Sequence, residues 1–313
     1  MKFDNRFFLV IIGAITIYAI FLMITDFSLI ASKISNFQIN YLPIILVVVP
    51  LGWLVLFLRW TFLLKNANIS IPVRESIKIY LAGFAFVLPA KFGELVKSQI
   101  MKTKYDIPYK TTTSLVLTER LYDLAGAIAV SFLGLLSIGV GIYIITVALA
   151  LLIIIFAMIS SRSFFNHIIN FIGKIKFLQK FQQSLSDSYE TVRISTRPKI
   201  AFIGILTTSI FWLLESLGVY FVLLAFGIDI IDYFSVVSIY ASSLILGAAS
   251  FIPGGLGVAE GSLVGMLNAQ GVEISMAFVL VVLIRIFTLW YGVIAGFISL
   301  KLSGGLTGKS KPN

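Results

Sequence analysis

Cysteine is absent from the 313 residues, and histidine occurs once, at His167. Without cysteine there can be no disulfide, thiol nucleophile or thiolate metal site. A single histidine in a predicted loop argues against a histidine-based metal site, and no Walker-type loop supports ATP hydrolysis. The sequence therefore predicts no metal, no cofactor and no catalytic residue, and whether the chain is an enzyme stays an open question that leans towards no.

Charge is also scarce. Only 12% of the residues are charged and 59% are hydrophobic, with a mean hydropathy of +1.02. Soluble domains are about 45–50% apolar and about 25% charged. The composition predicts an all-α polytopic membrane protein, in which any chemistry takes place in or at the bilayer. The net charge of +10 is explained by basic cytoplasmic loops and by attraction to anionic lipid. A nucleic-acid partner is therefore not expected.

Six apolar runs are long enough to span a bilayer, which takes about 20 residues. They are residues 7–23, 41–58, 114–136, 138–159, 200–226 and 275–300. The first resembles a signal peptide but lacks a cleavage site, and we expect it to be retained as a helix. Residues 76–88 are too short to span, and the run from 233 to 268 is broken in its middle. The expected fold has about six spanning helices and two re-entrant helical hairpins.

The break in the second hairpin contains Pro253, Gly254, Gly255 and Gly257, followed by Glu260. A weaker copy upstream contains Pro89, Gly93 and Glu94 in the same order. Arg120 follows Pro89 by 31 residues, and Arg285 follows Pro253 by 32. We interpret this spacing as a duplicated unit within a single transmembrane domain, residues 1–313. Repeat 1 spans about 76–136 and repeat 2 about 233–300.

Basic residues predict the orientation of the chain. Of the 24 lysines and arginines, 21 fall in segments assigned to the cytoplasmic side, including residues 59–78 and 91–110. Residues 162–199 contribute seven of these and are expected to form an amphipathic segment in the cytoplasmic interface. This assignment places both termini in the cytoplasm of a multi-pass cell-membrane protein. It also orients the two hairpins oppositely, as in transporters built from inverted repeats.

Charges inside hydrophobic helices are costly, so each one is a candidate functional residue. The set comprises Glu94, Glu119, Arg120, Asp123, Glu215, Glu260 and Arg285. We expect Arg120 and Arg285 to grip a phosphate, because a guanidinium donates two parallel hydrogen bonds. For Glu119 and Asp123 the alternative is a structural ion pair, because Asp123 shares a helix face with Arg120, three residues away, and with Glu119, four residues away. Arg285 has no acidic neighbour in sequence, so it meets Glu260, Glu215 or a bound anion.

Two further features are candidates for ligand binding. The break at Pro253–Gly257 could aim backbone N–H groups at an anion, or simply form a tight turn. Lys91, Glu94 and Lys97 flank the first break, where the lysines either meet anionic headgroups or only mark the cytoplasmic side. Gly257, Gly261 and Gly265 recur every four residues, a pattern that favours close helix packing.

Three segments carry a resemblance to a known family: LPAKFGELVKSQIM at 88–101, LTERLYDL at 117–124 and FIPGGLGVAEG at 251–261. They resemble the flippase-like family that includes the transmembrane part of lysylphosphatidylglycerol synthase, the multiple peptide resistance factor. The resemblance implies a bilayer-embedded domain with re-entrant helices that moves anionic or modified lipids between leaflets. The matched positions are Pro89, Gly93, Glu94, Glu119, Arg120, Asp123, Pro253, Gly254, Gly255, Gly257, Glu260 and Gly261. The synthase's soluble aminoacyltransferase domain is missing here, so lipid aminoacylation by this chain alone is not expected.

The leading hypothesis is a flippase-like transporter of an anionic phosphate-bearing lipid or of a polyprenyl-phosphate-linked lipid. Relatives in the family occur beside glycosyltransferases, which leaves two alternatives. One is a membrane-embedded transferase that uses an intramembrane carboxylate as base on a lipid-linked sugar. The other is a membrane anchor for a separate glycosyltransferase or lipid-modifying enzyme. The expected partners are membrane lipids and, in the last case, that enzyme.

Overall fold

A computed structural model describes residues 33–87, 95–134, 192–250 and 255–304, with scattered residues between 143 and 189. These ranges are helical, with no strand among them. The predicted span 7–23 and most of 138–159 and 162–199 lie outside the described residues. The first predicted break, with Pro89, Lys91, Gly93 and Glu94, also lies outside the described residues, as do Pro253 and Gly254 of the second break, whose Gly255 and Gly257 are described.

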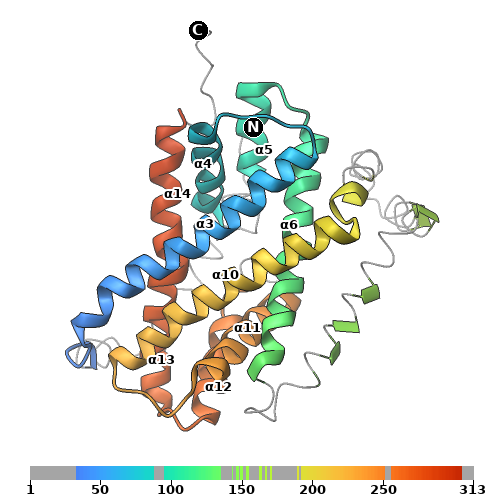
Figure 1. The fold of residues 1–313 in the computed structure, drawn as a ribbon. Helices are drawn as coiled ribbons and strands as arrows, with labels where there is room; N and C mark the ends of the chain where they lie inside the picture. Colours follow the sequence, from blue (N-terminus) through green and yellow to red (C-terminus); the bar gives the residue numbers. More distant parts are fainter. Residues whose placement is uncertain are drawn as a thin grey trace.

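Figure 1 shows the arrangement of the described helices. In chain order they are η1 (Ile39–Tyr41), α3 (Leu42–Asn66), α4 (Val73–Ala82), η2 (Gly83–Phe86), α5 (Leu95–Tyr105), α6 (Tyr109–Ser131), η4 (Phe132–Gly134), α10 (Pro198–Ala225), α11 (Tyr233–Ala249), α12 (Val258–Ala269), α13 (Ile274–Arg285), η7 (Ile286–Trp290) and α14 (Tyr291–Leu302). We call α4 to α6 the first unit and α11 to α14 the second unit.

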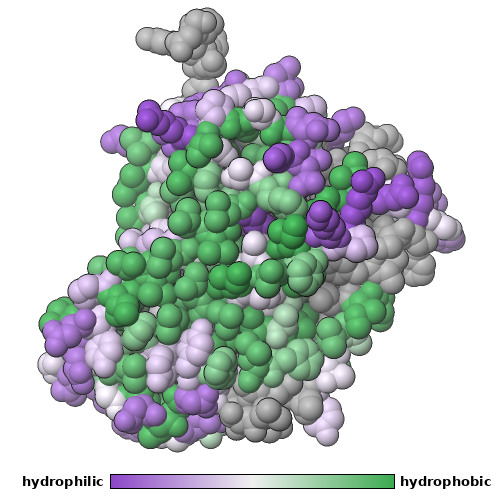
Figure 2. Space-filling view, in the orientation of Figure 1, coloured by the Kyte–Doolittle hydropathy of each residue, from purple (hydrophilic) through white to green (hydrophobic). Residues whose placement is uncertain are grey.

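Three helical stretches in the described ranges are long and apolar enough to cross a membrane: Ile39–Asn66, Pro198–Ala225 and Ile274–Leu302. Each coincides closely with a span predicted from the sequence, 41–58, 200–226 and 275–300. Their outward faces are apolar, with exposed side chains such as Val47, Leu58 and Phe202. Figure 2 shows the resulting broad apolar surface across the middle of the molecule, with polar residues towards its ends. This surface is suited to contact with lipid tails.

The short helices α4, α5, α11 and α12 have 10, 11, 17 and 12 residues. None reaches the roughly 20 residues that a spanning helix needs. Figure 1 shows α4 and α5 near one end of the molecule and α11 and α12 near the opposite end. Helix α11 begins at Asp232, whose side chain accepts hydrogen bonds from the backbone N–H groups of Phe234 and Ser235. The Ser235 hydroxyl also donates to Asp232 and lowers the pKa of this carboxyl.

Each unit contributes one long helical element that packs against a short helix of the other unit. Helix α6 of the first unit contacts α11 of the second, and α14 of the second contacts α4 and η2 of the first. Helices α3 and α10 lie side by side across both units (Figure 1). Separate apolar clusters fill the first unit and the second, and a third cluster joins α6 to α11. Trp212 of α10 packs against all three clusters, so it lies where the units meet.

We expect Gly296→Val to loosen the contact between α14 and η2. A Cβ atom at Gly296 would lie 2.3 Å from the Ala85 backbone nitrogen and 2.7 Å from the Phe84 carbonyl carbon. Backbone cannot yield as a side chain can, so the destabilisation should reach about 1–3 kcal/mol or more. The matched control is Gly261→Ala in α12, where no described atom lies within 4 Å of an added Cβ. Unfolding in detergent measures both, and equal stability of Gly296→Val and wild type would contradict this close approach.

Candidate functional site

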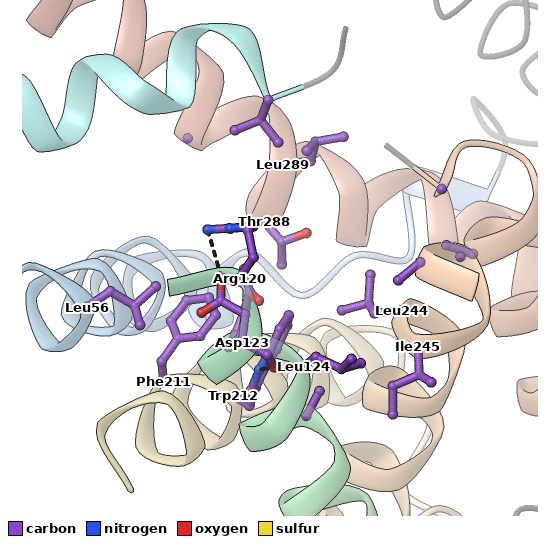
Figure 3. A pocket seen from close by; sticks show the side chains of 18 of the residues that line it. Leu56, Arg120, Asp123, Leu124, Phe211, Trp212, Leu244, Ile245, Thr288 and Leu289 are labelled. Carbon is purple, nitrogen blue, oxygen red and sulfur yellow. Dashed lines mark hydrogen bonds and ion pairs between the residues drawn. The ribbon is translucent and has the colours of Figure 1, made fainter. Parts of the chain in front are cut away.

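A cavity of about 690 Å³ lies where the two units meet, and we call it the interunit cavity. The first unit lines it from η2 and α6, and the second from α11 through α14. Helices α3 and α10 complete the wall. Most lining side chains are apolar or aromatic, including Leu56, Phe211, Leu244 and Ile245 (Figure 3). The polar lining side chains are Arg120, Asp123, Glu215, Tyr240, Arg285 and Thr288.

A first ionic cluster, made of Arg59, Lys97, Glu119, Arg120 and Asp123, borders the cavity on the side of the first unit. Arg59 of α3 is at its centre, with only 1% of the residue exposed. Its Nη1 atom donates to Asp123 Oδ1 at 2.6 Å and to Thr208 Oγ1 at 2.5 Å. Its Nη2 atom donates to Glu119 Oε1 at 3.3 Å. Arg59 thus joins α3, α6 and α10 through side chains alone.

Lys97 of α5 reaches the same cluster from the other side. Its Nζ atom donates to Glu119 Oε2 at 2.6 Å. The ammonium also lies 4.6 Å from the ring centroid of Trp60 and 5.2 Å from that of Tyr80, within the range of cation–π attraction. Glu119 is therefore shared by two buried cations from different helices.

Arg120 and Asp123 are the members of the first ionic cluster that line the cavity. Arg120 Nη2 lies 2.7 Å from Asp123 Oδ2, one helical turn along α6 (Figure 3). The Arg120 side chain is 38% exposed, so it is the accessible member of the cluster. Trp212 fixes the helix beside it, because its Nε1 atom donates to the Asp123 carbonyl at 3.0 Å.

Two residues of this cluster correct the sequence-based assignment. The sequence predicts that Arg59 and Lys97 are cytoplasmic residues outside the apolar spans, yet both are buried, at 1% and 2% exposure. Helix α3 continues through Arg59 to Asn66 instead of ending at residue 58. Lys97 faces Glu119 inside the protein instead of an anionic headgroup at the cytoplasmic mouth. The partners on α6 explain both differences, since they compensate the two charges within the fold.

A second ionic cluster, made of Glu215, Glu260 and Arg285, lies on the side of the second unit. Arg285 Nε is 2.7 Å from Glu260 Oε1, an ion pair without the alignment of a hydrogen bond. Arg285 is 5% exposed, and its Nη2 atom has no hydrogen-bond partner among the described residues. Glu215 of α10 lines the same cavity at 8% exposure, together with Tyr240 of α11.

The start of α12 differs from the expected anion cradle. The Gly257 N–H donates to Glu260 Oε2 at 2.7 Å, so Glu260 occupies the position an anion would take. Gly255 lines the cavity with φ of +67°, and an added Cβ would lie 2.9 Å from the Gly247 backbone. Gly255 and Gly257 therefore fit the second expectation for this segment, a tight turn, better than an anion cradle. Gly261 and Gly265 are exposed with open space around them, so the close packing expected of that stripe was wrong within the described chain.

Directly after Arg285 the helix changes to a π-helical turn, η7. Such turns are rare and frequently occur at functional sites. Thr288 and Leu289 in this turn line the cavity (Figure 3), and the Thr288 hydroxyl donates to the Ile284 carbonyl at 2.8 Å. No pattern of apolar residues distinguishes this turn from an ordinary helix, so sequence reasoning missed it.

The predicted site residues fall into three groups. Those that line the interunit cavity are Arg120, Asp123, Glu215, Gly255 and Arg285. Four others do not line the cavity but contact members of the two ionic clusters: Lys97, Glu119, Gly257 and Glu260. Lys91, Glu94, Pro253 and Gly254 lie outside the described residues.

Comparison with known proteins connects this geometry to a family. Residues 10–296 match the family model described as the lysylphosphatidylglycerol synthase TM region. A UPF0104 membrane protein of Methanocaldococcus jannaschii is 30% identical over 228 residues, which cover 68% of this chain and 90% of the relative. Another of Pyrococcus horikoshii is 22% identical over 321 residues, covering 93% and 95% of the two chains.

Proposed function

This chain belongs to the family of the lysylphosphatidylglycerol synthase transmembrane region, and we propose that it is a flippase-like transporter of an anionic, phosphate-bearing lipid. Polyprenyl-phosphate-linked lipids belong to the same chemical class. The observation that carries the proposal is that Arg120 and Arg285, from different units, line one largely apolar cavity. A lipid has the matching chemistry, with an anionic headgroup attached to hydrocarbon.

Arg285 is the better anchor for a phosphate. Its Nη2 atom is buried without a described partner, and leaving such a donor unpaired is costly. A phosphate oxygen would satisfy it with a charge-assisted hydrogen bond. The cavity volume of about 690 Å³ lies within the range of about 300–1,000 Å³ typical of small-molecule sites.

The arrangement of the two units supports an inverted repeat. In this proposal α4 with α5 and α11 with α12 are re-entrant hairpins that enter from opposite faces of the membrane. Their short helices, their positions at opposite ends and the reciprocal packing of α6 on α11 and of α14 on α4 favour it. Transporters of this plan bind substrate near the midplane, where the repeats meet.

The topology completes the proposal. Six spanning helices would put both termini in the cytoplasm of the plasma membrane. Lys102 and Lys104 end α5, and Lys301 lies in the last turn of α14, the helix that packs against α4 of the same unit as α5. In this topology that side is the cytoplasmic one, which the positive-inside rule favours because these lysines lie there.

Reconstitution in liposomes tests the proposed transport. Vesicles would contain a trace of phosphatidylglycerol or phosphatidylcholine labelled with a fluorophore that membrane-impermeant dithionite quenches. We expect the protein to expose inner-leaflet phosphatidylglycerol faster than protein-free vesicles do, with a smaller effect on zwitterionic phosphatidylcholine. If no anionic lipid, including a polyprenyl phosphate, moved faster than in empty vesicles, the proposal would be wrong. A change in lipid mass after incubation with a sugar donor would instead favour the transferase.

A further inference from the structure

Glu215 is a buried carboxylate in the interunit cavity to which the proposed transport assigns no task. It lies in the middle of α10, and the residue is 8% exposed. No described cation lies within 4.0 Å of its carboxylate, although Arg285 acts on it from a longer distance. The inference drawn here rests on the proposed function and concerns how that site is regulated.

The charged and titratable neighbours of Glu215 come from several helices. Arg285 of α13, Tyr240 of α11 and Asp123 of α6 line the same cavity and act on its carboxylate. Arg59 of α3 is engaged with Asp123, and η7 presents the neutral Thr288. Arg285 itself is already paired with Glu260 of α12. Glu215 therefore shares its nearest cation with another carboxylate.

The two ionic clusters have opposite formal charge when all their groups are ionised. The first has three cations, Arg59, Lys97 and Arg120, against the carboxylates Glu119 and Asp123. The second has one cation, Arg285, against the carboxylates Glu215 and Glu260. An anion that reaches Arg285 thus meets a site that is already negative. Uncompensated charge in a poorly solvated site is expensive.

We propose that Glu215 takes up one proton when an anionic headgroup engages Arg285. The proton comes from the bulk solution, relayed by water that enters the cavity, and converts the carboxylate to a neutral carboxyl. This carboxyl can donate to the Tyr240 oxygen, while Arg285 Nη2 donates to the headgroup. The negative charge at this end of the cavity then stays constant, because the headgroup replaces Glu215 as the counterion of Arg285. Release of the headgroup returns the proton.

Binding of a soluble lipid at several pH values tests this coupling. The probe is dioctanoyl phosphatidylglycerol, whose phosphodiester is a strong acid and stays ionised at neutral and mildly acidic pH. The full-length protein in maltoside micelles reports binding through Trp53 and Trp212, which line the cavity. Uptake of one proton should tighten binding by up to about tenfold for each unit that pH falls. In a weakly buffered solution, an indicator dye should record about one proton taken up for each lipid bound.

Substitutions at Glu215 test whether this residue is the one that takes up the proton. Glu215→Gln should bind at all pH values about as tightly as wild type does at the acidic end, with no proton uptake. Glu215→Asp should keep the pH dependence, and so should Glu273→Gln, which removes an exposed carboxylate paired with Lys33 far from the cavity. An unchanged pH slope in Glu215→Gln would overturn the inference. Binding by wild type without pH dependence would overturn it while leaving the proposed function intact. Absence of binding at every pH would count against both.

Discussion

Replacing Glu119 with leucine is expected to destabilise the protein by about 3–5 kcal/mol, the cost of breaking a buried ion pair from one side. Glu119 is buried, at 2.6 Å from Lys97 Nζ and 3.3 Å from Arg59 Nη2. The substitution removes the anion that these two buried cations share. Denaturant unfolding in mixed micelles measures the loss. The variant should also weaken the attachment of α5 to α6, which proteolysis between the two helices would report.

Two further variants test whether any loss of stability in Glu119→Leu comes from its buried unpaired charges. The double substitution Glu119→Leu with Lys97→Met removes charge of both signs and should recover much of the stability, because apolar replacement of a buried pair is often neutral. Glu75→Gln breaks the Lys78 pair, whose side chains are 30–35% exposed, and should cost no more than about 1 kcal/mol. If Glu119→Leu were no more costly than Glu75→Gln, the first ionic cluster would not stabilise the fold.

Replacing Arg285 with glutamine is expected to weaken binding of an anionic lipid by about 10- to 100-fold, the loss of one charge-assisted hydrogen bond. Glutamine keeps a polar group beside Glu260 but removes the positive charge. Arg285→Lys keeps the charge while losing the planar fork, so it should give an intermediate affinity. Titration of the two variants and wild type with dioctanoyl phosphatidylglycerol at one pH measures the series.

Stability separates binding from folding in this series. Because Glu260 also accepts the Gly257 N–H, it keeps one partner in each variant. Arg285→Lys should therefore unfold close to wild type while binding more weakly. Equal affinity in Arg285→Lys, Arg285→Gln and wild type would mean that Arg285 serves only as the partner of Glu260.

The sequence contains enough to predict the family and the main helices, because long apolar runs and the glycine-rich breaks are local signals. The family match confirms the resemblance, and the predicted run 200–226 corresponds to α10, Pro198–Ala225. That Arg120 and Arg285 share one cavity agrees with a site between the repeats, although lipid binding by these arginines stays a prediction. The spans and breaks outside the described residues also stay predictions.

The burial of Arg59 could not be predicted from the sequence around it. An arginine and a tryptophan after an apolar run are typical of a helix end at the membrane surface. Here the run continues because partners far along the chain, Glu119 and Asp123, compensate the charge inside the protein. Nothing near Arg59 in sequence indicates those partners. The pairing of Glu260 with both Gly257 and Arg285 likewise depends on how α12 meets α13.

The central claim is that the interunit cavity holds an anionic lipid through Arg285, and native mass spectrometry from gentle detergent tests it most directly. Wild type, Arg285→Gln and Glu273→Gln would be compared at equal protein and detergent concentrations. We predict that wild type and Glu273→Gln retain a defined phospholipid or polyprenyl phosphate, and that Arg285→Gln loses it. Retention of the same lipid by all three proteins would contradict the claim.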